Sequence, residues 1–268
     1  MNVLILTDFS EVSENASRYA LDFLRETPST IYLLNIQDIN LNAGSSEKLG
    51  KKMLLISEKM QAAIDKLQTY NTNSKHKFHL NLSVDNLITA VRGCVEEKKI
   101  DLIFIGAASQ KERKHPLLGN HAYEIIQKVK CNILAVPDKV KFVNPKRMIL
   151  PIDYSVLSEK KSFQILRDRN YVRAESLTVL NINENENYSL NQEMIQELWE
   201  SDSEENMNFK SLNKNVFFNT DFLLNIQEQY DVIVVFGKNL SISDKLLHSR
   251  YGLCSKISNK LPILVLHD

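Results

Sequence analysis

The stretch Met1-Asn-Val-Leu-Ile-Leu-Thr-Asp-Phe-Ser10 decides the fold, because the chain repeats it as Arg147-Met-Ile-Leu-Pro-Ile-Asp-Tyr-Ser155. Both copies consist of an apolar run followed by an aspartate, an aromatic residue and a serine. Each copy also ends with two similar apolar segments. These are 101–106 and 131–137 in the first copy, and 231–237 and 261–266 in the second. A chain of 268 residues suits two domains of common size. We therefore predict two related domains, at residues 1–140 and 146–268.

The first copy alternates buried strands with amphipathic helices. Apolar runs without alternation, bounded by turn residues, are typical of parallel strands that are buried on both faces. Such runs occupy 3–6, 31–36, 102–105 and 133–136, and 78–83 alternates as a strand near an edge does. Helical patterns lie between them, at 16–25, 47–69, 87–97 and 122–129. This order predicts a doubly wound, Rossmann-like α/β domain with a parallel sheet and right-handed crossovers.

The second copy repeats this alternation with a shorter middle. Its expected strands are 148–152, 176–182, 216–218, 232–236 and 263–266. Asp8 and Asp153 are 145 positions apart, whereas Gly106 and Gly237 are 131 apart, so the middle has lost about fourteen residues. The irregular part, 183–215, contains an acidic segment at 183–205. That segment is either a solvated helix face or loop, or a docking surface for a basic partner.

The charge balance argues against two classes of partner. The chain has 33 basic and 33 acidic side chains, whereas nucleic acids and anionic membranes select for a basic surface. The apolar run at 3–6 is too short for a signal peptide, and no segment is long enough to span a bilayer. We therefore expect a cytoplasmic protein with neither partner. Three cysteines without CxxC spacing and six scattered histidines predict no disulfide framework and no metal site.

Two aspartates stand where an open parallel sheet binds ligands. Asp8 and Asp153 each follow the first strand of their copy. Ligands of such sheets bind outside the carboxyl ends of the strands, where the strand order reverses. An aspartate there either accepts hydrogen bonds from a base or ribose, or caps the following helix. Spacing alone leaves both roles open.

The segment 106–120 is the second candidate for a binding element. It runs Gly106-Ala-Ala-Ser-Gln-Lys-Glu-Arg-Lys-His-Pro-Leu-Leu-Gly-Asn120 and leads into a helix. Backbone amides of a glycine loop and of a helix N-terminus form a natural phosphate site, to which the basic residues of the loop would add charge. The alternative is an exposed basic loop whose glycines only form turns.

Together these features resemble the universal stress protein family, as a tandem member with two domains. The resemblance rests on Thr7-Asp-Phe-Ser10, the strand ending in Gly106, the Leu-Leu-Gly-Asn turn that ends at Asn120, and the close at 131–137. The resemblance covers nearly the whole chain at the level of the order of elements, and it is stronger in the first copy. It implies two domains of the fold shared with adenine nucleotide alpha hydrolases. It also implies an intramolecular pseudo-dimer, in which the closing strands at 133–136 and 263–266 lie side by side and cover each other's edges.

The resemblance further implies a nucleotide site. Many members bind ATP through Gly-x2-Gly-x9-Gly-[Ser/Thr], with the aspartate after the first strand on the nucleoside, and others lack the motif and bind none. This chain has Gly106, Ser109, Gly119 and Asn120 at those positions, together with Asp8. If position 109 needs a left-handed backbone, serine costs about 1–2 kcal/mol, roughly tenfold in affinity.

In the second copy the positions that correspond by the 131-residue offset are Gly237, Leu240, Arg250 and Tyr251. Three of the four motif elements are absent there. We therefore expect the second domain to be a degenerate copy that does not bind ATP in the manner of the family.

Two functions follow from this pattern. The first is a non-catalytic universal stress protein of the stress response that binds ATP or another adenine nucleotide weakly in its first domain, with no cofactor required. The second is a scaffold or interaction protein that has lost both ligand sites. No serine elbow, His-Glu metal pair or Walker loop predicts an enzyme. The sequence leaves open whether two chains form a homodimer.

Overall fold

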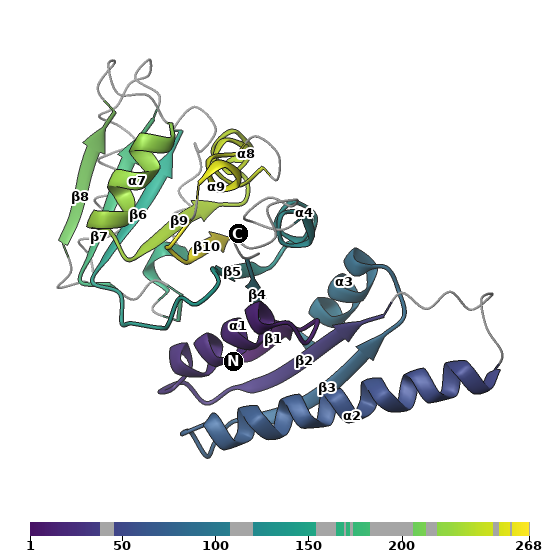
Figure 1. Ribbon diagram of the computed structural model, residues 1–268. Coiled ribbons are helices and arrows are strands. Elements are labelled where there is room, and N and C mark those ends of the chain that lie inside the picture. The colour runs from purple at the N-terminus through teal and green to yellow at the C-terminus, as the bar shows by residue number, and fades with distance from the viewer. Residues whose placement is uncertain are drawn as a thin grey trace.

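The described strands form one ten-stranded sheet that runs through both halves of the chain (Figure 1). Its strand order is β3-β2-β1-β4-β5-β10-β9-β6-β7-β8, so the order of the second half mirrors that of the first. We refer to β1–β5 with their helices as the first half and to β6–β10 as the second half. The computed structural model describes residues 1–37, 46–107, 120–153, 165–168, 170–171, 174–182, 206–212, 219–248, 252–257 and 259–267.

In the first half, five parallel strands alternate with four helices among the described residues. The strands are β1 (Asn2–Leu6), β2 (Thr30–Ile36), β3 (Lys77–Ser83), β4 (Leu102–Gly106) and β5 (Asn132–Val136). The helices are α1 (Glu11–Phe23), α2 (Ser46–Tyr70), α3 (Leu87–Lys98) and α4 (Asn120–Lys128). The predicted strands and helices of this half are confirmed, with β3 at one edge of the sheet. Helix α1 ends at Phe23, before the predicted residue 25.

The second half repeats the plan with shorter helices. Its strands are β6 (Arg147–Ile152), β7 (Ser176–Asn181), β8 (Asn206–Ser211), β9 (Val232–Phe236) and β10 (Ile263–Leu266). Its described helices are the 3-10 helix η1 (Ile165–Arg167), α7 (Thr220–Gln229), α8 (Leu240–Leu247) and α9 (Leu253–Lys256). Within the described ranges, no helix combines the length and apolar character that crossing a membrane requires.

Strand β8 lies in a segment that the sequence analysis assigned to irregular structure. It pairs in parallel with β7, with Phe209 opposite Val179. Met207 and Phe209 pack against the core, whereas Asn208 and Lys210 are exposed, so this short strand alternates between partly buried and exposed residues. The predicted strand at 216–218 and the acidic segment at 183–205 lie outside the described residues.

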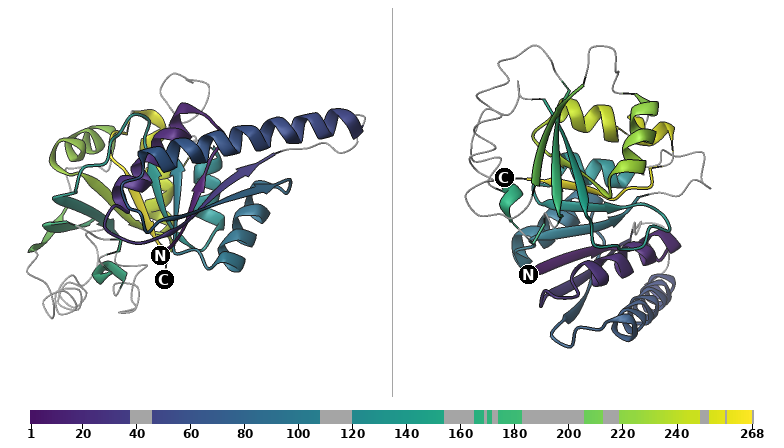
Figure 2. Two further views of the ribbon diagram at one scale, coloured as in Figure 1. Left: turned by 90° about the horizontal axis from the view of Figure 1, so that it is seen from below. Right: turned by 90° about the vertical axis from the view of Figure 1, so that its left-hand side faces the viewer.

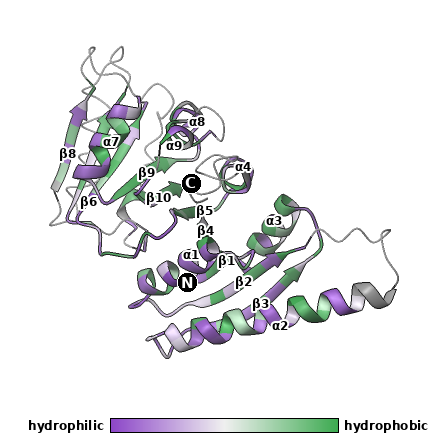
Figure 3. Ribbon diagram, in the orientation of Figure 1, coloured by the Kyte–Doolittle hydropathy of each residue, from purple (hydrophilic) through white to green (hydrophobic). Residues whose placement is uncertain are grey.

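Helices cover both faces of the sheet, and a hydrophobic core lies on each side (Figures 2 and 3). On one face, α1 and α2 pack against the first half through residues such as Tyr19, Phe23 and Leu67. On the other face, α3, α4, α7, α8 and α9 contribute residues such as Ile125 and Leu246. Because both faces are covered, the central strands are apolar throughout, which is why their sequences read as continuous apolar runs.

The two halves join through the antiparallel pair β5–β10. Leu134 lies opposite Leu264, Ile133 opposite Val265 and Ala135 opposite Ile263. Leu134 and Leu264 are equivalent positions of the two halves, so the pair has a local twofold axis between them. The predicted intramolecular pseudo-dimer, with these two strands side by side, is confirmed.

Backbone pairing defines which residues of the two halves are equivalent. The Asp101 carboxylate accepts a hydrogen bond from the Asn2 amide (2.7 Å), and the Asp231 carboxylate accepts one from the Arg147 amide (2.9 Å). Asp231 therefore corresponds to Asp101, and Phe236, rather than Gly237, corresponds to Gly106. The predicted offset of 131 is wrong by one residue, because the two glycines are not at equivalent places on their strands.

The connection between the halves is fixed to the first half. The Asn15 side chain donates hydrogen bonds to the carbonyl oxygens of Pro137 (3.2 Å) and Val140 (3.1 Å). The Phe142 ring makes edge contacts with the rings of Tyr19 (5.3 Å between centroids) and Phe23 (5.9 Å). Since aromatic pairs of this kind stabilise by about 0.5–1.5 kcal/mol each, the connector is a packed element of the fold.

We predict that Leu134 and Leu264 are energetically coupled. Both are almost fully buried and lie directly opposite each other, so each change to Ala should lower the free energy of unfolding by about 2–5 kcal/mol. The double variant should lose less than the sum, because the second truncation enlarges a cavity that the first has already opened. Urea denaturation of the four proteins measures the coupling.

Leu4→Ala with Leu264→Ala is the matched control, since Leu4 belongs to the core on the other face of the sheet. Those two losses should add. Additive losses for the Leu134 and Leu264 pair would contradict a shared contact at the axis.

His76 is predicted to make the stability of the first half depend on pH. Its Nδ1 accepts a hydrogen bond from the Ser29 amide (3.2 Å), which only the neutral ring can do. Burial, and then the positive N-terminus, lower the pKa of His76 below 6.5. His76 therefore takes up a proton more readily in the unfolded chain than in the folded one. The stability that the neutral ring contributes is present above about pH 6.5 and is lost as the pH falls through the pKa of the folded state.

His76→Gln should flatten this dependence, because an amide oxygen can accept from Ser29 without titrating. Thermal unfolding between about pH 7.5 and 5 compares the two proteins. His79→Gln, at an exposed position, should keep the wild-type slope. Parallel curves for wild type and His76→Gln would refute the assignment.

Candidate functional site

The candidate site is the edge of the sheet at the carboxyl ends of β1 and β4, where the strand order of the first half reverses. These strands are neighbours, with Ile5 opposite Phe104, so the residues that follow them lie at one edge of the sheet. Asp8 follows β1 and Gly106 ends β4. The fold therefore brings these two predicted site residues to the same edge, as open α/β sheets do at their ligand sites.

The loop after β1 has an unusual backbone. Phe9 has φ of 64°, in the left-handed region that costs about 1–2 kcal/mol for a residue with a side chain. Two local hydrogen bonds hold the turn, from the Phe9 amide to Thr7 Oγ1 (3.1 Å) and from the Ser10 amide to Asp8 Oδ1 (3.0 Å). Strain held in this way clusters at functional sites. The sequence carries no signal for it, because phenylalanine is not a typical residue for this conformation.

Ser10, and not Asp8, caps α1. The Ser10 hydroxyl accepts a hydrogen bond from the Ser13 amide (3.2 Å), and the Ser13 hydroxyl donates to the Ser10 carbonyl (3.0 Å). The interpretation of Asp8 as the helix cap is therefore wrong. Its carboxylate is exposed and accepts the turn-closing hydrogen bond from the Ser10 amide.

Asp8 is held in its charged form. Partial burial raises the pKa of Asp8, but hydrogen bonds from the hydroxyl and amide of Ser10 and from Ser13 together outweigh it, so the pKa lies below its ordinary value. An ionised carboxylate is purely a hydrogen-bond acceptor. It is suited to hydroxyl or amino groups of a ligand, such as those of a ribose or a base.

Asn35 is a buried residue of this region that the sequence analysis missed. It lies near the carboxyl end of β2 and is 1% exposed. Its amide donates to the Thr7 carbonyl (2.7 Å), and its Oδ1 accepts from the Gln37 side chain (2.6 Å). Asn35 thus fixes the start of the loop that carries Asp8. An asparagine within the apolar run 31–36 was the available signal, since a buried amide needs partners.

Gly106 is required by the packing of α1. A Cβ at this position would lie 2.8 Å from Val12 Cγ1 and 3.0 Å from the Val12 carbonyl oxygen. The absence of a side chain therefore lets the first turn of α1 approach the end of β4. Ser109 and Gly119 lie outside the described residues, and Asn120 is described only as the first residue of α4. Their places in the site remain predictions.

The equivalent edge of the second half is filled by its own residues. Phe236 replaces Gly106 in register, and its side chain is 4% exposed. Helix α8 follows, with Ile242, Leu246 and Leu247 fully buried. The Asn239 side chain, also buried, donates to the Asp153 carbonyl (3.5 Å). A packed helix stands where the family motif would require a glycine loop.

Gly237 is likewise covered, because a Cβ there would overlap the ring of His267. Of the motif positions that the sequence analysis named in this half, Arg250 and Tyr251 lie outside the described residues. Among the described residues of this edge, bulky side chains thus stand where the first half has Gly106.

Two cysteines and two histidines of the described part of the chain have structural surroundings. Burial raises the pKa of Cys131 and of Cys254 to about 12, so neither thiol is reactive. His76 accepts from Ser29, and His79 stacks on Tyr32 (5.1 Å between centroids). Among the described residues, no three His, Cys, Asp or Glu side chains are grouped so that they could hold a metal ion.

Comparisons with known proteins agree on one family. A model described as the universal stress protein family matches residues 1–137. A universal stress protein of Methanocaldococcus jannaschii, MJ0531, is 25% identical over 136 residues, which are 50% of this chain and 80% of that protein.

A solved structure of the same family has the same fold over the whole chain. A universal stress protein from Archaeoglobus fulgidus aligns over 99% of this chain and 96% of its own, with a TM-score of 0.68 and 14% identity. A universal stress protein in complex with cAMP aligns with 52% of this chain and 98% of its own, with a TM-score of 0.41 and 17% identity. The Archaeoglobus match extends over both halves.

We predict that Gly106→Ala lowers the free energy of unfolding by about 1–3 kcal/mol, because the methyl group would overpack against Val12. Gly93→Ala is the matched control. Gly93 lies inside α3, and a methyl group added there would have no neighbouring atom within 4 Å, so the same change should stabilise by about 0.5–1 kcal/mol. Urea denaturation of both variants measures the change in the free energy of unfolding. No change for Gly106→Ala would contradict the close approach of Val12 to Gly106.

Proposed function

The chain belongs to the universal stress protein family, and we propose that it acts in the stress response by binding an adenine nucleotide in its first half, without catalysing a reaction. The observation that carries this proposal is the exposed, ionised Asp8 beside the close approach of α1 to Gly106, at the edge where the strand order reverses. A nucleoside offers hydroxyl and amino donors to such a carboxylate.

The affinity is expected to be weak. Ser109 and Asn120 stand where the family motif has glycine and a hydroxyl residue. Serine in a left-handed backbone costs about 1–2 kcal/mol, and an amide contacts phosphate less compactly than a hydroxyl. These substitutions weaken the phosphate part of the site and leave the nucleoside part, with Asp8, in place.

The second half supports a different role. Phe236, Asn239 and α8 fill the edge that corresponds to the candidate site. Strand β10 covers the edge of β5 along its length. We therefore assign the second half a scaffold function with respect to the nucleotide and restrict nucleotide binding to the first half. The whole chain is a scaffold if the first half binds no nucleotide.

We predict that Asp8→Asn weakens ATP binding by about tenfold or more, because a hydrogen bond to a charged group contributes about 1.5–3 kcal/mol. Asparagine keeps an oxygen for the Ser10 amide, so the loop is preserved and the charge alone is removed. Isothermal titration calorimetry of the full chain with ATP measures the difference. Mass spectrometry of the supernatant after heat denaturation tests for a co-purified nucleotide.

Asp153→Asn, the same change in the second half, should leave the affinity unchanged. Gly119→Val should remove binding. Wild-type protein that shows no binding at millimolar ATP and releases no nucleotide would reject the proposal in favour of the scaffold.

A further inference from the structure

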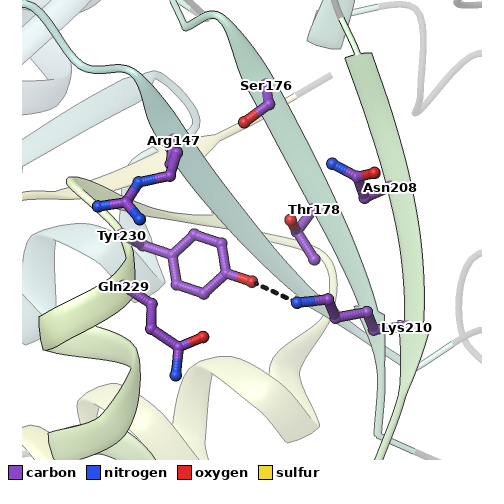
Figure 4. A pocket seen from close by; sticks show the side chains of 7 residues that line it. All are labelled: Arg147, Ser176, Thr178, Asn208, Lys210, Gln229 and Tyr230. Atoms are coloured by element: carbon purple, nitrogen blue, oxygen red, sulfur yellow. Dashed lines mark hydrogen bonds between the residues drawn. The ribbon is translucent and has the colours of Figure 1, made fainter.

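A second, independent feature is a polar pocket of the second half, lined by residues of β6, β7 and β8 and of the end of α7. Arg147, Ser176 and Thr178 line it from β6 and β7, and Lys210 and Asn208 from β8. Tyr230, after the end of α7, closes one side, and its hydroxyl lies 3.4 Å from Lys210 Nζ. Figure 4 shows these side chains gathered around a common space.

The pocket exists because the second half lacks two rings that the first half has at the same register. Tyr32 pairs with His79 across β2 and β3, and the two rings stack 5.1 Å apart. Their counterparts are Thr178 and Asn208, which pair across β7 and β8. Two small polar side chains therefore replace a stacked pair, and the space between the strands and α7 opens.

The comparison of the two halves also explains why Arg147 brings a positive charge to the pocket. In the first half, the Asn2 side chain donates to the carbonyl oxygens of Lys98 (2.8 Å) and Lys99 (3.3 Å), at the end of α3. Arg147 replaces Asn2, and the hydrogen bond to the Asp231 carboxylate comes from its backbone amide. Its guanidinium is thus a planar donor at the rim of the pocket, a group that binds carboxylate and phosphate in a bidentate manner.

The local field favours an anion. None of the residues that line the pocket is acidic, and Asp231 nearby is turned towards the backbone amides of Lys146 and Arg147. The end of α7 contributes about half a negative charge. Arg147 and Lys210 are the charged side chains among the residues that line the pocket, and both are positive.

We propose that this pocket binds a small oxyanion, such as a phosphate or carboxylate group. The cavity volume of about 200 Å³ is below the roughly 300–1,000 Å³ of pockets for drug-sized ligands, so the occupant is small. Arg147 and Lys210 supply the charge, and the hydroxyl groups of Ser176, Thr178 and Tyr230 supply further donors. This site does not depend on nucleotide binding in the first half.

The test is titration of the full chain with inorganic phosphate and, separately, with malonate, at constant ionic strength. Phosphate binding is followed by ³¹P line broadening, and both anions by calorimetry. Arg147→Gln and Lys210→Gln should each weaken binding by about ten- to a hundredfold, the effect of losing a charge-assisted hydrogen bond. Lys256→Gln removes an exposed charge elsewhere in the second half and should have no effect.

A second variant keeps both cations. Thr178→Tyr with Asn208→His rebuilds the stacked pair of the first half, and should abolish binding by filling the space. Thermal melting without anion checks that each variant is folded. If the Thr178→Tyr, Asn208→His variant does not fold, Arg147→Gln still tests the site, because Arg147 is at an exposed position. Saturable binding of either anion that depends on Arg147 and Lys210 supports the site. Absent binding, or binding unchanged in both Gln variants, overturns it.

Discussion

The antiparallel pairing of β5 with β10 is the constraint on which the rest of the molecule depends. A doubly wound half leaves its last strand with a row of unpaired amides and carbonyls, and exposed edges of this kind invite association. Here each half supplies the other's missing neighbour, with Leu134 and Leu264 at the local axis. Because that pairing is antiparallel, the strands of the two halves run in opposite directions. The carboxyl ends of the first half therefore lie along the same edge of the sheet as the amino ends of the second half.

Much of this architecture follows from local sequence. Strands that are buried on both faces must be apolar throughout, so 3–6, 102–105 and 133–136 are recognisable without a partner. Strand β8 was missed because its alternation, carried by Met207 and Phe209, is short and lies beside an acidic segment. The offset of 131 displaces the register of the second half by one residue, because Gly237 does not occupy the place of Gly106 on its strand. The actual anchors are Asp101 and Asp231, which bind backbone amides far away in the chain.

The candidate site was predictable only in part, for a related reason. Asp8 and Gly106 follow strands whose adjacency the fold class implies, so their meeting at one edge could be expected. The left-handed backbone of Phe9 could not, because phenylalanine is not a typical residue for that conformation. The hydrogen bond from Asn35 to the Thr7 carbonyl could not either, because it joins two different elements. Gly106 shows a further difficulty. A glycine that a binding motif requires can also be required by packing, and here the nearest obstacle to a side chain is Val12.

The two halves differ at both ends of their strands. In the first half the rings of Tyr32 and His79 stack, whereas Thr178 and Asn208 stand at the same register in the second half and line the polar pocket. At the other end, the exposed carboxylate of Asp8 follows β1. Since the sheet joins the halves with reversed strand direction, the carboxyl ends of the first half and the amino ends of the second half lie along one edge. Divergence of the two copies has therefore placed an exposed carboxylate and a pocket lined by two cations towards the same side of a continuous sheet.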